Sequence, residues 1–399
     1  MILQSVELVK KCPVCSSSSF SSFYTISHMP THVGILWKDK NEALSCPRGD
    51  IELACCSDCG FISNIAFDPS MMEYTREYDN SLYFSKCYRD YTKSIAERLI
   101  KGHQLYKKRI IEIGSGKGDF LYLLCEMGNN YGVGFDPSGD ENLYQQKSAD
   151  RMTLVKDYFS KKYSHYYGDF ICSRNVFEHV PDPLGFLKML RAAVHGKHNT
   201  VFYFEVPNIS LILKDLSVWD IIYEHCSYFG LTSLEKVFHA SGFNTIKLSH
   251  GFEGQFISIE ASPAKNIEKS FIQNQDTIKE FISLIKEFSY NCTMKLRWWD
   301  DTLRQIEQNN EKTVVWGAGG KSVSFLNILR SNNSIQYVVD INPRKQGCYV
   351  PGTGQRIILP EELTAYRPEN VIIMNPVYQQ EIRQQLDFLH LNPRVLLAL

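Results

Sequence analysis

The sequence predicts an α/β protein in which a central unit of alternating strands and helices is followed by a second, similar unit. Three observations predict this fold class. A strand, a glycine loop and a helix follow one another at 109–127, and the same order returns at 313–329. Two pairs of cysteines lie in a compact segment before both units. At 399 residues the chain is too long for one ordinary core, so we expect two or three domains.

The central unit is organised around its glycine loop. Isoleucines dominate 109–113, which indicates a buried parallel strand, and Gly114, Gly116 and Gly118 follow at alternate positions. Residues 120–127 then have helical character. Because glycine has no Cβ, its backbone can turn sharply and come close to a ligand. A strand, a loop and a helix in this order hold a nucleotide-like ligand at the N-terminus of the helix.

The spacing of the loop indicates which nucleotide it suits. Dinucleotide-binding loops read G-x-G-x-x-G, whereas this loop reads G-x-G-x-G. Glu112, on the strand before the loop, would repel a pyrophosphate but would suit the cationic end of S-adenosylmethionine. The next strand, 131–135, ends at Asp136, whose carboxylate can accept hydrogen bonds from ribose hydroxyls. This pattern resembles the class I S-adenosylmethionine-dependent methyltransferases. The alternative is a tight turn that binds no ligand.

Two later strands lead to further candidate residues. The strand 152–155 is followed by Asp157, at the place where this fold usually contacts the adenine. The strand 169–172 leads to Asn175, which we assign to the donor site, and to the pair Glu178 and His179. Because doubly wound sheets bind ligands at the carboxyl ends of their strands, this Glu-His pair should face the ligand. His179 is either functional or a satisfied surface histidine. A helix to residue 194 and a strand at 201–206 follow.

The densest cluster of proton-handling groups lies at 219–229. Tyr223, Glu224, His225 and Tyr228 come within a few residues of one another, among apolar neighbours. Histidine suits proton transfer near neutral pH, so His225 is the candidate base. The alternative is that His225 only hydrogen-bonds within a packed loop. A helix at 234–241 and a strand at 256–260 complete the central unit.

The N-terminal segment carries two C-x2-C pairs, which predict a structural zinc site. Four thiolates can form a closed tetrahedral site, and the four candidate ligands are Cys12, Cys15, Cys56 and Cys59. Cys46 and Cys55 are nearby, and either could replace one of these ligands. The alternatives are buried, reduced thiols, or a redox pair, for which the expected βαβ context is missing.

The C-terminal third begins with a predicted helix. Apolar residues recur at helical spacing in 267–308 without glycine or proline. A strand at 313–316, a glycine turn, a helix at 322–329 and a strand ending at Asp340 then resemble half of a Rossmann fold. Ser322 stands where a third glycine would complete the dinucleotide fingerprint. This unit is therefore either a substrate-binding domain or a degenerate scaffold. A last strand is expected at 371–375.

Composition excludes several classes of function. Lys and Arg together number 43 against 44 for Asp and Glu, and the net charge of −1 gives no electrostatic case for binding nucleic acid or an anionic membrane. No apolar run approaches membrane-spanning length, and no signal peptide is evident. We expect a soluble, cytoplasmic protein that is a monomer or a weak oligomer.

Taken in order, these features resemble the three-domain C-methyltransferases of deoxysugar biosynthesis, in particular those that methylate C-3 of nucleotide-linked deoxysugars. The cysteine pairs, the Tyr-Glu-His segment 223–229 and the segment 340–347 carry the resemblance. It implies a zinc-binding domain at 1–74 and a methyltransferase domain at 75–265. A helical linker at 266–308 and a Rossmann-like substrate-binding domain at 309–399 would follow. The implied cofactors are S-adenosyl-L-methionine and a structural Zn²⁺.

The resemblance also implies a reaction and roles for residues. The enzyme would deprotonate a carbon next to the ketone of a nucleotide-linked keto-deoxysugar and transfer a methyl group to that carbon. His225 would be the base, and the sugar would be bound by Tyr78, His179, Tyr223 and Glu224. The stretches 78–85 and 251–256 depart from the family, so its sugar is not carried over. The alternatives are an O- or N-methyltransferase of another small metabolite and a noncatalytic protein that binds zinc and a nucleotide.

Overall fold

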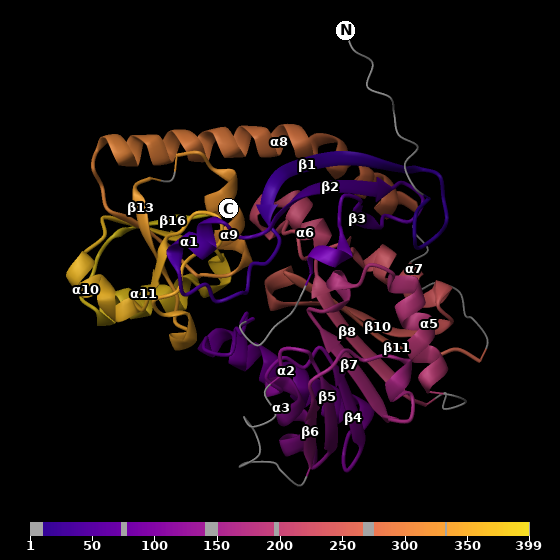
Figure 1. The fold of residues 1–399 in the computed structure, drawn as a ribbon. Coiled ribbons are helices and arrows are strands. Elements are labelled where there is room, and N and C mark those ends of the chain that lie inside the picture. Colours follow the sequence, from indigo (N-terminus) through magenta and orange to yellow (C-terminus); the bar gives the residue numbers. More distant parts are fainter. Residues whose placement is uncertain are drawn as a thin grey trace.

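A computed structural model describes residues 11–72, 78–139, 151–194, 199–265, 275–331 and 333–398. The chain has the predicted α/β fold, and its described residues form three sheets: an N-terminal, a central and a C-terminal one (Figure 1). The predicted domain boundaries at 74/75 and 265/266 lie outside the described residues.

The N-terminal sheet is antiparallel and has the strand order β1-β2-β3-β9. Its members are β1 (Phe20–Pro30), β2 (Arg48–Cys56), β3 (Ile62–Asn64) and β9 (Ser227–Tyr228). A short helix, α1 (Lys40–Leu44), connects β1 to β2 and is capped by the carboxylate of Asp39. Because β9 belongs to the Tyr-Glu-His segment, this segment is an edge strand of the N-terminal sheet.

The central sheet has the order β10-β11-β8-β7-β4-β5-β6. Five strands are parallel: β4 (Arg109–Ile113), β5 (Tyr131–Phe135), β6 (Met152–Val155), β7 (Phe170–Arg174) and β8 (Val201–Pro207). The antiparallel strands β10 (Phe243–Gly251) and β11 (Phe256–Pro263) complete one edge. Helices pack on its faces: α2 (Lys86–His103), α3 (Asp119–Gly128), α5 (Pro183–Ala193) and α7 (Leu231–Ala240). The short helix α6 (Ile209–Lys214) follows β8 and packs toward the N-terminal sheet.

The first glycine loop has the geometry that its sequence predicts. Gly114 and Gly118 have φ values of 71° and 86°, in the left-handed region that favours glycine. A Cβ at Gly114 would lie 2.1 Å from a methyl carbon of Val176. The loop after β4 can therefore pass directly under the loop after β7 only because residue 114 is glycine.

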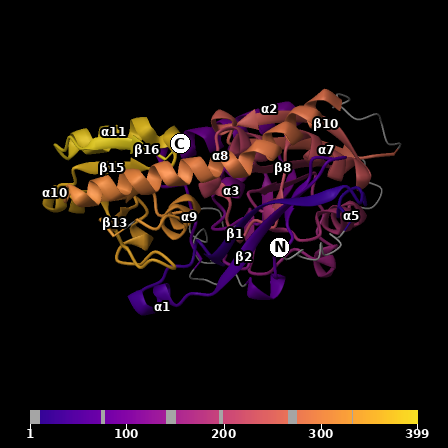
Figure 2. The same ribbon diagram turned by 90° about the horizontal axis from the view of Figure 1, so that it is seen from above.

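The C-terminal sheet is wholly parallel, in the order β14-β13-β12-β15-β16. Its strands are β12 (Thr313–Trp316), β13 (Ile335–Val339), β14 (Arg356–Ile358), β15 (Asn370–Ile373) and β16 (Arg394–Leu397). Its helices are α9 (Gly320–Ile328), α10 (Leu363–Tyr366) and α11 (Gln379–Phe388). The long helix α8 (Gln275–Gln308) runs from the N-terminal sheet to this domain (Figures 1 and 2).

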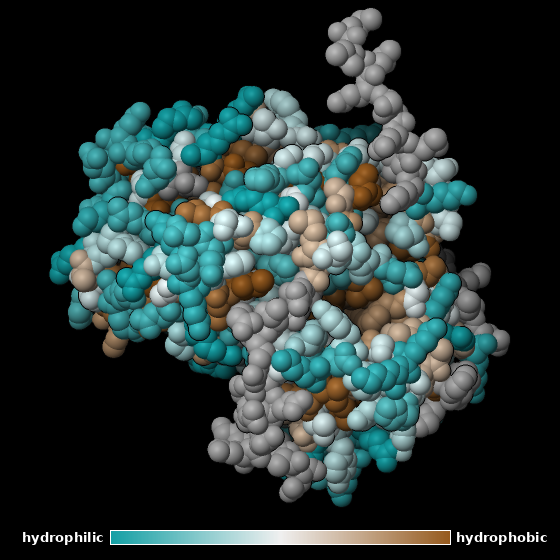
Figure 3. Space-filling view, viewed as in Figure 1, coloured by the Kyte–Doolittle hydropathy of each residue, from teal (hydrophilic) through white to brown (hydrophobic). Residues whose placement is uncertain are grey.

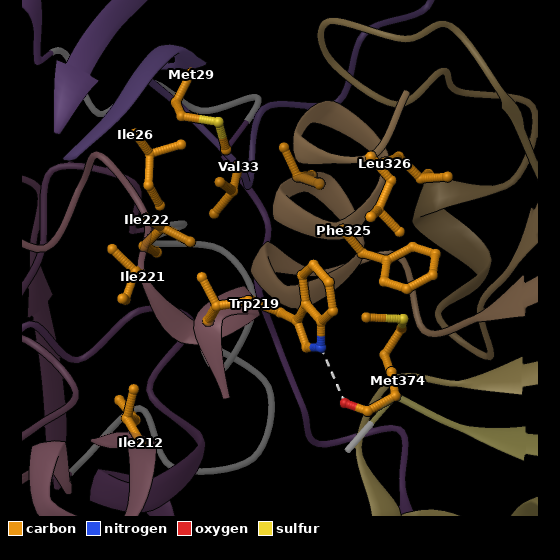
Figure 4. Packing of buried hydrophobic residues seen from close by; sticks show 14 of the residues in the cluster. Ile26, Met29, Val33, Ile212, Trp219, Ile221, Ile222, Phe325, Leu326 and Met374 are labelled. Atoms are coloured by element: carbon orange, nitrogen blue, oxygen red, sulfur yellow. Dashed lines mark hydrogen bonds between the residues drawn. The ribbon is translucent and has the colours of Figure 1, made fainter. Parts of the chain in front are cut away.

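One hydrophobic cluster joins the N-terminal sheet to the C-terminal sheet, with residues of α6, α8 and α9 between them (Figure 4). Trp219 is fully buried at its centre, beside Phe325 of α9, and its indole N–H donates to the carbonyl of Ala398 at 2.9 Å. Ile222 and Val33 pack into the same cluster. Residues 219–222, just before His225, are thus packed between the C-terminal domain and the N-terminal sheet.

Hydrophilic residues cover most of the face seen in Figure 3. Within the described residues, each helix is either too short or too polar to cross a membrane.

Candidate active site

A cavity of about 910 Å³ opens at the carboxyl ends of the central strands, against the C-terminal domain. Its walls come from both glycine loops, from the loop after β7, and from the segments 78–85 and 219–225. The parallel strands of each sheet place their following loops on one side, which brings these distant segments together.

The first glycine loop (114–118) is held by hydrogen bonds to the end of β5 and to Asp136, which follows it. The amide of Gly114 donates to the carbonyl of Phe135 at 2.8 Å, and the amide of Gly116 donates to a carboxylate oxygen of Asp136 at 2.8 Å. The other oxygen of Asp136 accepts from the amide of Ser138 at 2.7 Å. These bonds hold Asp136 beside the glycine loop, directly after β5, where the sequence analysis expected that strand to end.

Glu112 lies under the same loop and is 3% exposed. One of its oxygens accepts the amide of Leu121, in the first turn of α3, at 3.0 Å. Burial raises the pKa of Glu112 to about 8, although the positive charge of Arg174 opposes the rise, so the carboxyl group is largely protonated at neutral pH.

Asn175 and Asp157, the other two residues predicted to bind the methyl donor, differ in position. Asn175 lines the cavity with a φ of 54°, and its side-chain oxygen is buried without a partner among the described residues. Asp157 lies outside the cavity lining, where it accepts hydrogen bonds from the hydroxyl of Tyr163 at 2.6 Å and the ammonium of Lys162 at 3.1 Å. Its neighbour Tyr158 lines the cavity instead.

Two histidines meet at the centre of the cavity wall. The ring centroids of His179 and His225 are 4.9 Å apart, edge to face. The Nδ1 of His179 lies 3.0 Å from the carbonyl oxygen of Glu224, and since a carbonyl only accepts, this nitrogen carries the proton. Burial lowers the pKa of His179 to about 4. Burial, His179 and Lys321 together hold the pKa of His225 well below its usual value. Both rings are therefore neutral at physiological pH.

The carboxylate of Glu224 links three parts of the chain. One oxygen accepts the amide of Val33 at 2.6 Å, and the other accepts the hydroxyl of Tyr78 at 2.7 Å. Burial and this carboxylate raise the pKa of Tyr78 well above its usual value, so Tyr78 stays a phenol and a donor. The structure thus brings together Tyr78, His179, Glu224 and His225, which the sequence analysis had assigned to one site.

Tyr223 lies elsewhere. Its ring packs on Gly49 and Phe67, and its hydroxyl accepts the amide of Asp68 at 3.0 Å. The cavity lining does not include it. Tyr223 and Glu224 lie together in a turn that the amide of His225 closes by donating to the carbonyl of Ile222 at 3.2 Å. Within this turn Tyr223 faces the N-terminal sheet, whereas Glu224 faces the cavity.

The cavity lining also includes Glu178, Lys321 and Asp220, to which the sequence analysis gave no catalytic or binding role, although it expected the Glu-His pair to face the ligand. Glu178 is 2% exposed, and its Oε2 has no partner among the described residues. The ammonium of Lys321, just after the second glycine turn, contacts both carboxylate oxygens of Asp220. The sequence signal for Glu178 was its place beside His179. Nothing local in the sequence indicates that Lys321 meets a residue 101 positions earlier.

The second glycine loop repeats the bonding of the first. The amide of Gly317 donates to the carbonyl of Val339 at 2.7 Å, and the amide of Ala318 donates to Asp340 at 2.8 Å. The difference is Lys345, which is buried at 5% exposure. Its ammonium donates to the carbonyl of Ala318 at 2.8 Å and lies 3.4 Å from Asp340. The carboxylate of Asp340 therefore already has a cationic partner, the ammonium of Lys345. The observed partners of Asp136, in contrast, are uncharged hydrogen-bond donors.

The four predicted zinc ligands come together at the end of the N-terminal sheet. The sulfur atoms of Cys12 and Cys59 are 3.6 Å apart, and those of Cys15 and Cys56 are 3.5 Å apart. All four lie within 4.8 Å of one another. A tetrahedral site with Zn–S bonds of about 2.3 Å needs sulfur–sulfur separations of about 3.8 Å, so the donor set fits this metal. Cys46 and Cys55 are not part of the cluster, as far as the described residues show.

Known proteins resemble separate parts of the chain. Residues 83–248 match the family description "Methyltransferase domain", and residues 260–395 match "C-methyltransferase C-terminal domain". The C-methyltransferase NovU of Streptomyces niveus is 23% identical over 288 residues, which cover 68% of this chain and 67% of that protein.

The solved structures that resemble part of the chain include two methyltransferases. One is a putative sarcosine dimethylglycine methyltransferase from Galdieria sulphuraria. It is 14% identical with a TM-score of 0.36, and the match covers 43% of this chain and 85% of that one. The other is CalO1, a methyltransferase in calicheamicin biosynthesis, in its SAH-bound form. It is 15% identical with a TM-score of 0.33, and the match covers 43% and 54% of the two chains.

Proposed function

We propose that this chain, an S-adenosylmethionine-dependent C-methyltransferase, methylates the carbon next to the ketone of a nucleotide-linked keto-deoxysugar. The two domain matches and the similarity to NovU establish the enzyme class. One observation carries the choice of substrate. A single cavity joins the donor loop, the histidine pair and a second nucleotide-type loop, so it has room for a donor and for a substrate that carries its own nucleotide.

The donor is assigned to the first glycine loop. S-adenosylmethionine supplies an electrophilic methyl group and carries two cationic centres. In this proposal Asp136 binds the ribose hydroxyls, and Glu112 faces the cationic end. Gly114, Gly116 and Gly118 let the backbone approach the ligand, and Asn175 closes the site from the loop after β7. The position of Asp157, outside the cavity lining, argues against a direct contact with the donor.

His225 is assigned the role of base. A carbon next to a ketone is a poor nucleophile until it loses its proton, and a neutral imidazole carries the lone pair that can accept it. The C–H bond breaks, its electron pair forms the enolate, and the proton moves to His225. The enolate carbon then bonds to the methyl group as the methyl–sulfur bond breaks.

The sugar is assigned to the residues around His225. Tyr78 and Glu224 form a donor–acceptor pair that can contact hydroxyl groups, and His179 presents its second ring nitrogen beside them. In this proposal Tyr223 supports the segment from behind instead of touching the sugar. The packing of its ring on Gly49 supports that assignment.

The C-terminal domain is assigned to the nucleotide of the substrate. Gly319, Gly320 and Lys321 line the cavity at the N-terminus of α9, and such a helix end with a lysine suits an anionic group. Because Lys345 already neutralises Asp340, this loop is a poor site for the ribose of a nicotinamide cofactor. The four N-terminal cysteines are assigned a structural zinc ion.

The test is incubation with labelled S-adenosylmethionine and a panel of nucleotide-linked keto-deoxysugars, with the reduced sugars as controls. We expect a new carbon–carbon bond in the product, and exchange of the α-proton with heavy water when the donor is absent. Methylation on oxygen or nitrogen would support the other class of methyltransferase and contradict the proposal.

A matched pair of variants tests the base. His225→Asn should keep donor binding and lower the rate by on the order of 10²-fold or more, because it removes the proton acceptor. His250→Asn changes an exposed histidine of β10 and should leave the rate unchanged. A His225→Asn enzyme with the wild-type rate would move the search for the base to His179.

A further inference from the structure

Glu178 is a buried carboxyl group to which the proposed reaction gives no role. It lies in the turn Phe177–His179 that follows β7, and it is 2% exposed. Its Oε2 has no hydrogen-bond partner among the described residues, although it borders the cavity. A buried, unpaired carboxyl oxygen is unfavourable and requires an explanation.

His225 shows the same deficiency. Its Nδ1 is buried and also has no partner among the described residues. One ligand atom each from Glu178, His179 and His225 lie within 4.8 Å of one another. Two residues of this cluster, Glu178 and His225, thus each carry a buried polar atom without a partner among the described residues, at the point where the proposed base must become charged.

We propose that Glu178 is a positioning residue for His225, whose carboxylate accepts a hydrogen bond from the imidazole as this ring takes the proton of the substrate. The inference rests on the proposed function and adds to it a specific partner for the base. Glu224 is less suited to the role, because its two oxygens already accept the amide of Val33 and the hydroxyl of Tyr78.

Charge gives the physical reason for such a partner. Burial and the neighbouring Lys321 and His179 all oppose a positive charge on His225. A neutral ring in this environment is a weak base unless an anion stabilises its protonated form. The carboxylate of Glu178 supplies that anion from inside the protein, without requiring water to enter the cavity.

The proton balance is simple. The substrate C–H bond breaks and its electron pair forms the enolate. The proton binds one nitrogen of His225, and the N–H of the other nitrogen donates to Glu178. After methyl transfer the ring releases its proton to solvent, which restores the starting state. No oxidant or reductant is involved.

The ionisation of Glu178 provides a readout. Burial, and to a smaller degree the carboxylate of Glu205 on β8, raise the pKa of Glu178 to about 8. The other titratable groups around it are His179, His225, the phenol of Tyr78 and the thiol of Cys226, which donates to the carbonyl of Glu178 at 3.5 Å. Because the carboxylate is the active form, the rate should fall as the pH decreases below about 8.

The first test compares Glu178→Gln, Glu178→Asp and the control Glu126→Gln on the exposed side of α3. We expect Glu178→Gln to bind the donor normally, to lose about tenfold or more in rate, and to lose the pH limb near 8. Glu178→Asp should keep the limb and part of the rate, and Glu126→Gln should behave as wild type. A Glu178→Gln enzyme with the wild-type rate and pH profile would overturn the inference.

A second measurement needs no substrate. NMR titration of the labelled imidazole of His225 should show a chemical-shift step near pH 8 in the wild type, where Glu178 ionises beside the ring, and the titration of Glu178→Gln should lack this step. An unchanged titration would overturn the inference even if no sugar is found. Conversely, if the step is lost in Glu178→Gln but no keto sugar is methylated, the proposed function fails and the pairing of Glu178 with His225 stands. A metal ion beyond zinc that is lost in Glu178→Gln would assign the cluster to cation binding and also overturn the inference.

Discussion

The buried carboxyl group of Glu112 predicts that binding of S-adenosylmethionine releases a proton. Without the donor, burial raises the pKa of Glu112 to about 8, so at pH 7 the folded protein holds a proton there. The ammonium and sulfonium groups of the donor favour the carboxylate form. Below pH 8 the donor must therefore displace this proton, and its affinity should rise with pH until the carboxyl group is already ionised.

The size of the effect follows from the pKa. Each unit between the pH and the pKa costs about 1.4 kcal/mol, or a factor of ~10 in affinity. At pH 7, one unit below the pKa of Glu112, the dissociation constant should be about tenfold larger than at pH 9. At pH 6 it should be about a hundredfold larger. Above pH 8 the affinity should level off.

Calorimetry in two buffers with different ionisation enthalpies counts the released protons. We expect close to one proton at pH 7 and close to none at pH 9. The pKa of Glu178 is also raised to about 8, so variants must separate the two carboxyl groups. Glu112→Gln should bind the donor more weakly and without proton release, whereas Glu178→Gln should keep the release. Full proton release by Glu112→Gln would refute the reasoning.

Two further predictions concern the framework of the site. Freshly purified, reduced protein should hold about one zinc ion per chain. The variant Cys56→Ser should lose the zinc and unfold at a lower temperature, whereas the control Cys55→Ser, at the adjacent position, should keep it. Metal analysis that finds no zinc in the wild type would contradict the assignment. Tyr78→Phe removes a hydrogen bond to the buried carboxylate of Glu224 and should cost about 1.5–3 kcal/mol in urea unfolding. The hydroxyl of Tyr83 is buried without a partner among the described residues, so Tyr83→Phe should cost little, and equal losses for the two tyrosines would contradict the expectation.

The strands of both Rossmann-like units could be predicted because their signals are local. Runs of buried β-branched residues that end at glycine identified β4 and β12, and the short apolar stretch that ends at Asp136 identified β5, with the bounds that the structure has. The helix predicted at 322–329 begins at Gly320 instead, because the carbonyl of Gly319 in the glycine turn accepts the amides of Ser322 and Val323. The strands of the N-terminal sheet were not predicted, since each is short or interrupted by irregular pairing.

The site was harder to predict than the fold. Sequence reasoning located the segment 223–229 but not the orientation of its side chains, which depends on what packs behind it. Gly49 leaves the space that the ring of Tyr223 fills, and this contact joins residues far apart in the chain. The orientation of Asp157 could not be predicted for the same reason. Its expected position near the adenine came from the fold class alone, which does not determine where the side chain points. Its local partners Tyr163 and Lys162 hold it on the surface.

The pairing of β9 with β3 connects the cysteine cluster to the chemistry. Ser63 lies opposite Ser227, and the amide of Asn64 donates to the carbonyl of Cys226 at 3.0 Å, one residue after His225. Strand β2, which pairs with β3, ends at Cys56, a proposed zinc ligand. Zinc bound there would fix the register of β2 and β3. Because β9 pairs with β3, it would also fix the position of His225 relative to the first glycine loop. Loss of the metal should therefore lower the catalytic rate at temperatures where the central sheet is still folded and still binds the donor.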